Sequence, residues 1–86
     1  MIKSEYIDRI NLLYNTKLGK DFTNINEIAK NNALNWLDEF ALYNRPYYIF
    51  PSYSEGILIE YTTSALNVSV ECHNNGEIEI ISSALD

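Results

Sequence analysis

Cys72 and His73 are the two residues most suggestive of catalysis, because a thiol beside an imidazole can form a nucleophile and its base. Adjacent side chains on an extended strand point to opposite faces, so this pair cannot meet as a dyad. We expect Cys72 on the apolar face as a small core residue. We expect His73 beside the following turn, either solvated or in contact with Glu77. The sequence therefore predicts no catalytic residue at this pair.

Metal and cofactor sites are also not expected. Structural zinc needs about four Cys or His ligands, and the chain has one Cys and one His. The three glycines, Gly19, Gly56 and Gly76, form no phosphate-binding loop.

The acidic residues Glu60, Glu71, Glu77 and Glu79 are a second candidate group. We expect them on the outer face of a sheet, where carboxylates stay ionised and lack the pocket that acid–base catalysis needs. They form either a solvated face or a patch for a basic partner. A solvated face is the ordinary interpretation. The absence of any Lys or Arg after Arg45 is an argument for the patch, because solvated faces usually mix both signs.

Tyrosines are the third candidate group, with seven in the chain. Tyr43, Tyr47, Tyr48 and Tyr53 surround Arg45 at the junction of the two halves of the chain. Tyrosine and arginine are favoured anchors of protein interfaces. The other interpretation is that these tyrosines form half-buried edges of a small core.

Length and charge limit the possible classes of protein. A chain of 86 residues forms one domain, which we place at 1–86. The formal net charge is −6, and residues 1–45 contain every Lys and Arg. Direct nucleic-acid binding and anionic membranes are disfavoured, because both require cations to meet phosphates. No apolar run is long enough to span a membrane, and the start lacks a signal pattern, so we expect a cytoplasmic protein.

Residues 1–45 are expected to form two helices. Ser4 can cap the first, and Gly19 can end it. Its apolar stripe comprises Ile2, Tyr6, Ile7, Ile10, Leu13, Tyr14 and Leu18. The second helix follows a capping-box pattern that starts at Asn24. Its apolar face comprises Ile25, Ala29, Ala33, Trp36, Leu37, Phe40 and Tyr43. We expect Trp36 and Phe40 to be its main anchors on the sheet.

Residues 46–86 are expected to form three or four antiparallel strands. Apolar residues alternate from Ile57 to Tyr61 and from Leu66 to Cys72, and Ile78 and Ile80 continue the inward pattern. A three-residue loop, 74–76, with a left-handed Gly76 pairs Cys72 with Ile78 and keeps the apolar residues on one face. The predicted fold class is α+β, with two N-terminal helices on one face of a meander.

The second half also resembles a known group of proteins. The segment 51–61, the strand that begins at Leu66 and the Asn75-Gly76 turn are similar to small bacterial and phage proteins. In that group a Pro, a few polar residues and Gly-Gly-Ile lead into a strand that ends in Glu-Trp. Glu55-Gly56 and Tyr61 stand here where the group has two glycines and a Trp. The resemblance implies the α+β fold and a prokaryotic or phage source.

These patterns lead us to expect a non-enzymatic module that binds and regulates or inhibits another macromolecule, such as a phage-encoded defence inhibitor or an antitoxin-like protein. The expected partner is a protein with a basic surface. One alternative is a nucleic-acid mimic that blocks a basic channel, and another is a ligand-binding oligomer that uses the tyrosines. A homodimer is also expected, because four aliphatic residues fall off the core faces: Leu12, Leu34, Leu58 and Ile81.

Overall fold

The chain forms two helices followed by a four-stranded antiparallel sheet, as the α+β prediction requires. A computed structural model describes residues 3–19, 24–40, 47–53 and 55–84. The helices are α1 (Lys3–Asn15) and α2 (Glu27–Phe40). The strands are β1 (Tyr47–Ser52), β2 (Gly56–Thr62), β3 (Leu66–His73) and β4 (Ile78–Ala84). The strands lie in chain order, so the sheet is a meander.

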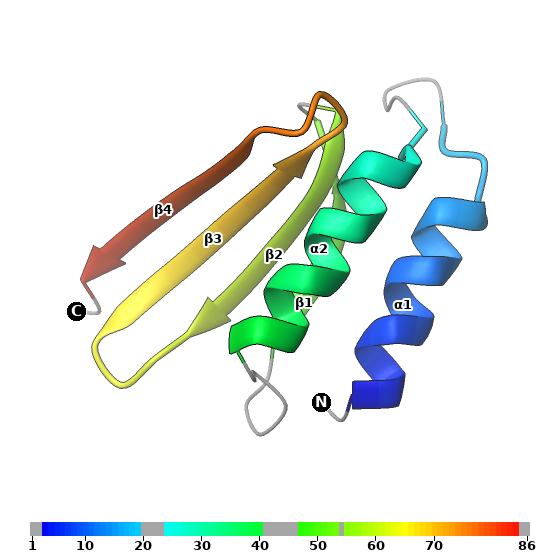
Figure 1. Cartoon of the computed structure of the whole chain (residues 1–86). Helices are drawn as coiled ribbons and strands as arrows, with labels where there is room; N and C mark the ends of the chain where they lie inside the picture. Colours follow the sequence, from blue (N-terminus) through cyan, green and yellow to red (C-terminus); the bar gives the residue numbers. More distant parts are fainter. Residues whose placement is uncertain (1–2, 20–23, 41–46, 54, 85–86) are drawn as a thin grey trace.

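The two helices lie side by side on one face of the sheet (Figure 1). α1 packs on β1, and α2 packs on β2 and β3. Each of the described residues of β4 is exposed, and β4 is the strand farthest from the helices (Figure 1). The opposite face of the sheet, here called the outer face, carries neither of these two helices.

The strand register confirms the predicted loop between β3 and β4. Cys72 lies opposite Ile78, and Glu71 lies opposite Glu79. Gly76 has a φ of 96°, the left-handed conformation that glycine adopts without strain. The register therefore keeps alternate side chains on the same face across this hairpin.

The core fills the space between the two helices and the sheet, and α1 contributes Tyr6, Ile10 and Leu13 to it. Its fully buried members on α2 are Ala29, Ala33 and Leu37, and the two alanines let the helix backbone approach the strands closely. Trp36 packs against this core but is only half-buried, so it is not the main anchor that was expected. The side chain of Phe40 and the whole of Tyr43 lie outside the described residues.

The helix ends differ from the predicted ones by a few residues. α1 begins at Lys3, so Ser4 lies inside the first turn, and α1 ends at Asn15 instead of Leu18. At α2 the cap is Asn26, whose Oδ1 accepts a hydrogen bond of 3.0 Å from the Ala29 N–H. Asn24 instead accepts a hydrogen bond from the Leu18 N–H. An asparagine two residues further along thus takes the predicted role.

The predicted burial of Ile78 and Ile80 is also wrong. Their register places them on the helix-facing side, opposite Cys72 and Val70. Nevertheless they are 42% and 54% exposed, because α2 does not reach as far as β4. Leu34, expected off the core, packs against it, whereas Leu12 and Ile81 are exposed as expected.

Candidate functional site

The outer face of the sheet gathers the predicted acidic residues. Glu71 lies opposite Leu58 on β2 and Glu79 on β4, and Glu60 lies opposite Ser69 on β3. These pairings place Glu60, Glu71 and Glu79 on one face, as predicted. Glu77 immediately precedes β4 and is exposed.

Hydroxyl groups hold two of these carboxylates. The Ser52 hydroxyl donates to Glu71 Oε2 at 2.6 Å, and the Ser69 hydroxyl lies 3.4 Å from Glu60 Oε2. Ser52 is buried although it is polar, so Glu71 is the more firmly positioned of the two.

His73 lies on the same face and is paired with an acid. Its Nε2 is 2.9 Å from Glu79 Oε1, and its side chain is almost fully buried, whereas that of Glu79 is 57% exposed. Of the two alternatives expected for His73, the solvated side chain is therefore wrong, and the contact with Glu77 exists only through the backbone. The side-chain partner is Glu79, and Glu77 is bound through the backbone, where its carbonyl accepts from the His73 N–H at 2.9 Å.

An apolar group lies among the carboxylates. Leu58 and Ile81 were expected off the core, but Tyr48 and Phe50 were not predicted on this face. The rings of Tyr48 and Phe50 are stacked, with centroids 6.3 Å apart and an interplanar angle of 8°. Leu58 lies opposite Phe50, and Ile81 lies opposite Ser69. The signal that could have found this group is the alternation in β1, which places residues 48 and 50 opposite to the core residues 47 and 49.

A hollow of about 420 Å³ opens beside Tyr48 and Glu60. Thr62 and Asn67, which pair across β2 and β3, form its other outer-face walls. Tyr61 and Val68, their neighbours in the chain, complete its lining. A hollow with one carboxylate and one exposed ring can hold a cationic side chain, because the cation gains both an ionic and a cation–π contact.

The predicted tyrosine cluster does not form among the residues that the structure describes. Tyr47 is buried in the core, where its ring lies 6.2 Å from that of Tyr6. Tyr48 faces the outer side, and Tyr53 is 82% exposed in the turn after β1. The pleat of β1 separates the first two, because adjacent residues point to opposite faces. Tyr43 and Arg45 lie outside the described residues.

Cys72 and His73 point to opposite faces, as predicted for adjacent strand residues. Cys72 is a free, fully buried thiol on the helix-facing side. Desolvation by burial raises the pKa of the Cys72 thiol from 9.0 to about 11, the opposite of what activates a thiol nucleophile. Within the described ranges, no group of three or more His, Cys, Asp or Glu residues could hold a metal ion.

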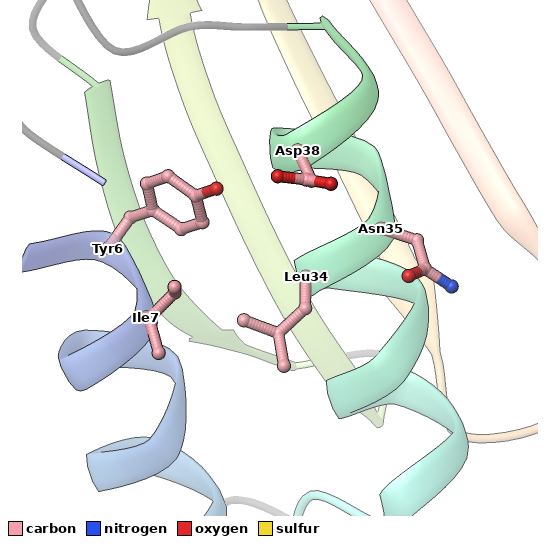
Figure 2. Close-up of a pocket in the computed structure, with 5 residues that line it drawn as sticks. All are labelled: Tyr6, Ile7, Leu34, Asn35 and Asp38. Atoms are coloured by element: carbon pink, nitrogen blue, oxygen red, sulfur yellow. The ribbon is translucent and has the colours of Figure 1, made fainter. Parts of the chain in front are cut away.

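A smaller hollow lies between the helices (Figure 2). Tyr6 and Ile7 line it from α1, and Leu34, Asn35 and Asp38 line it from α2. Its volume of about 200 Å³ falls below the range of roughly 300–1,000 Å³ that is typical of small-molecule sites. The outer face is therefore the better candidate site.

Comparison of the chain with known protein families, with curated proteins and with solved structures finds no match. Neither α1 nor α2, the helices in the part of the chain that is described, is long and apolar enough to cross a membrane.

Proposed function

We propose that the protein is a non-enzymatic binding module whose outer sheet face docks on a basic surface of another protein and thereby regulates or inhibits it. A phage-encoded defence inhibitor or an antitoxin-like protein is the setting that suits such a module. We place it in the cytoplasm of a bacterial cell, where a single reduced thiol such as Cys72 is the usual state of cysteine.

The observation that carries this proposal is the composition of the outer face. It presents Glu60, Glu71 and Glu79 beside the stacked pair of Tyr48 and Phe50. The sequence has no Lys or Arg after residue 45, so the only basic group that the described sheet sets beside these carboxylates is His73, next to Glu79. Such a face complements a positive surface, which it would attract over a Debye length of about 8–10 Å.

The aromatic residues supply the contact area that charge alone does not. Tyr48 is 61% exposed and Phe50 is 39% exposed, and exposed aromatic residues are favoured anchors of binding energy. The hollow beside Tyr48 and Glu60 is a binding site for a basic side chain of the partner. The carboxylates then steer the encounter, and the aromatic pair retains the partner.

The dispersed tyrosines give no support to a ligand-binding pocket built from Tyr47, Tyr48 and Tyr53. A nucleic-acid mimic would use the same acidic face, and its partner would be a nucleic-acid-binding protein. If DNA or RNA competes with this protein for the captured partner, the protein is a nucleic-acid mimic. If neither competes, it binds a basic surface that does not bind nucleic acid.

The test is affinity capture from a bacterial host, followed by quantitative mass spectrometry and a binding assay with the purified partner. Glu60→Lys combined with Glu79→Lys should reduce affinity at least tenfold, because two attractive charges become repulsive. Tyr48→Ala should weaken binding without changing its salt dependence. Affinity for wild-type protein should fall as salt rises.

Asp8→Lys combined with Glu39→Lys is the matched control. Both residues are exposed on the helices, and the double variant changes the net charge by the same amount. It should bind almost as tightly as wild type. A partner that binds the sheet variant and the wild type equally would overturn the proposal, provided that circular dichroism shows both variants to be folded.

A further inference from the structure

β4 is an edge strand of the sheet. It pairs with β3 on one side, and no strand of the described chain pairs with its other side. Natural edge strands are commonly protected by Lys, Pro or a bulge. The sequence of β4, IEIISSA, contains no Lys, Arg or Pro. The strand thus remains able to accept another strand.

The hydrogen-bond pattern identifies the groups that face this edge. The His73 N–H donates to the Glu77 carbonyl, so the pair 73 and 77 is hydrogen-bonded. Pairs alternate between bonded and non-bonded along an antiparallel ladder. The backbone groups of residues 79, 81 and 83 therefore point to β3, and those of Ile78, Ile80, Ser82 and Ala84 point to the open edge.

The other edge of the sheet is partly obstructed by contrast. The same alternation, carried across the sheet, turns the backbone groups of Tyr47, Ile49 and Pro51 to the outer edge of β1. The Ile49 carbonyl accepts a hydrogen bond of 3.1 Å from Arg9 Nε on α1, and Pro51 has no N–H to offer. Because β4 is the more open of the two edges, a closed pair through β4 is favoured over a growing sheet.

We infer that β4 pairs antiparallel with β4 of a second copy, about a twofold axis at Ile81, to form a continuous eight-stranded sheet. Ile81 is the middle residue of β4 (Ile78–Ala84), so a twofold axis there lets the whole strand pair with the same strand of the second copy. Ile80 then pairs with Ser82 of the second copy, and Ile78 pairs with Ala84. Each of these pairs joins residues whose backbone groups face the open edge.

The side chains on both faces of the sheet are compatible with this register of the two β4 strands. On the outer face Ile81 meets Ile81 of the second copy, so two residues that are each 60% exposed in the single chain become neighbours. Glu79 lies opposite Ser83, so no carboxylate faces another across the twofold axis. On the helix-facing side, Ile78 and Ile80 gain neighbours that α2 does not supply.

Charge gives this pairing a distinctive salt dependence. Each copy carries a formal net charge of −6, so two copies repel at long range, and the dimer should tighten as salt rises. Docking of a basic partner has the opposite dependence. The pairing uses the edge of β4 and leaves the outer face open, so it stands or falls independently of the proposed function.

The first test is sedimentation equilibrium on the full chain over a range of protein concentrations. Wild type should form a dimer. Ser82→Pro should shift the equilibrium to monomer, since it removes an N–H that faces the open edge and leaves the ladder with β3 intact. Ser83→Ala, one position along, should remain a dimer. A wild type that stays monomeric, or a folded Ser82→Pro variant that still dimerises, overturns the inference.

The second test reads the register and does not depend on the folding of a proline variant. Ile81→Cys should form a disulfide-linked dimer on mild oxidation, because facing residues of a non-bonded pair have Cα atoms about 4.5 Å apart. Ser83→Cys should not, because its two copies would be about 13 Å apart at a rise of 3.3 Å per residue. The native thiol of Cys72 is buried and does not interfere. Cross-linking through 83 and not 81 would refute this register.

Discussion

Asn26 donates two hydrogen bonds to Asn74, although the two residues lie 48 positions apart in the chain. The Asn26 N–H donates to Asn74 Oδ1 at 3.0 Å, and Asn26 Nδ2 donates to the Asn74 carbonyl at 2.8 Å. Asn74 also donates from Nδ2 to the Asn24 carbonyl and from its N–H to the Glu55 carbonyl. One residue of the β3–β4 turn thus ties together the start of α2 and the β1–β2 turn.

Asn74→Ala should destabilise the fold by about 1–3 kcal/mol, because it leaves part-buried donors and acceptors without their side-chain partner. Chemical unfolding of the variant and the wild type measures the difference. Asn31→Ala, an exposed change on α2, is the control and should be neutral or slightly stabilising. Equal stability of the Asn74→Ala variant and the wild type would show that the amide network contributes nothing.

Glu55→Gly should stabilise the protein. Glu55 has a φ of 63°, a left-handed conformation that costs about 1 kcal/mol or more for a residue with a Cβ. Glycine removes this strain, although it also gives the unfolded chain more freedom. We expect a net gain of about 0.5 kcal/mol, seen as a higher melting temperature. Glu55→Ala keeps the strain and should show no such gain.

Leu37→Ala should cost about 2–5 kcal/mol, because Leu37 is fully buried between α2 and the sheet. Leu12→Ala removes the same atoms from a residue that is 57% exposed, and its effect should stay within about 0.5 kcal/mol. Urea unfolding of both variants tests this contrast. Similar losses from the two changes would contradict the position of the core.

Stability should fall at alkaline pH through Cys72. Burial raises the pKa of this thiol from 9.0 to about 11. Below pH 9.0 the thiol is protonated in both the folded and the unfolded chain. Between the two values the unfolded chain loses its proton first, so the free energy of unfolding falls with rising pH, by up to roughly 3 kcal/mol in total.

Cys72→Ala is the control for this pH dependence. Both proteins carry the same tyrosines, lysines and other titratable groups, so the difference in slope between them isolates the thiol. The variant should lose less stability than the wild type between pH 9 and pH 11. Parallel stability curves for the two proteins would show that the thiol is not shielded from water.

Local patterns in the sequence were sufficient to predict the fold class and to predict which face of the sheet each strand residue points to. The alternation from Leu66 to Cys72 and the left-handed Gly76 predicted the register of the last hairpin. That register placed Glu71 and Glu79 on the outer face. These features follow from the period of two along a strand, which is a property of the backbone and needs no knowledge of distant residues.

Only the tertiary structure decided which of the inward-facing residues are covered. Ile80 and Val70 share a face and a register, yet Val70 is fully buried and Ile80 is 54% exposed. The difference arises because α2 lies over β2 and β3 and stops short of β4. Asn74 reaches the start of α2 only because the hairpin folds back on it. Periodicity predicts the direction of a side chain, but burial depends on where the neighbouring element packs.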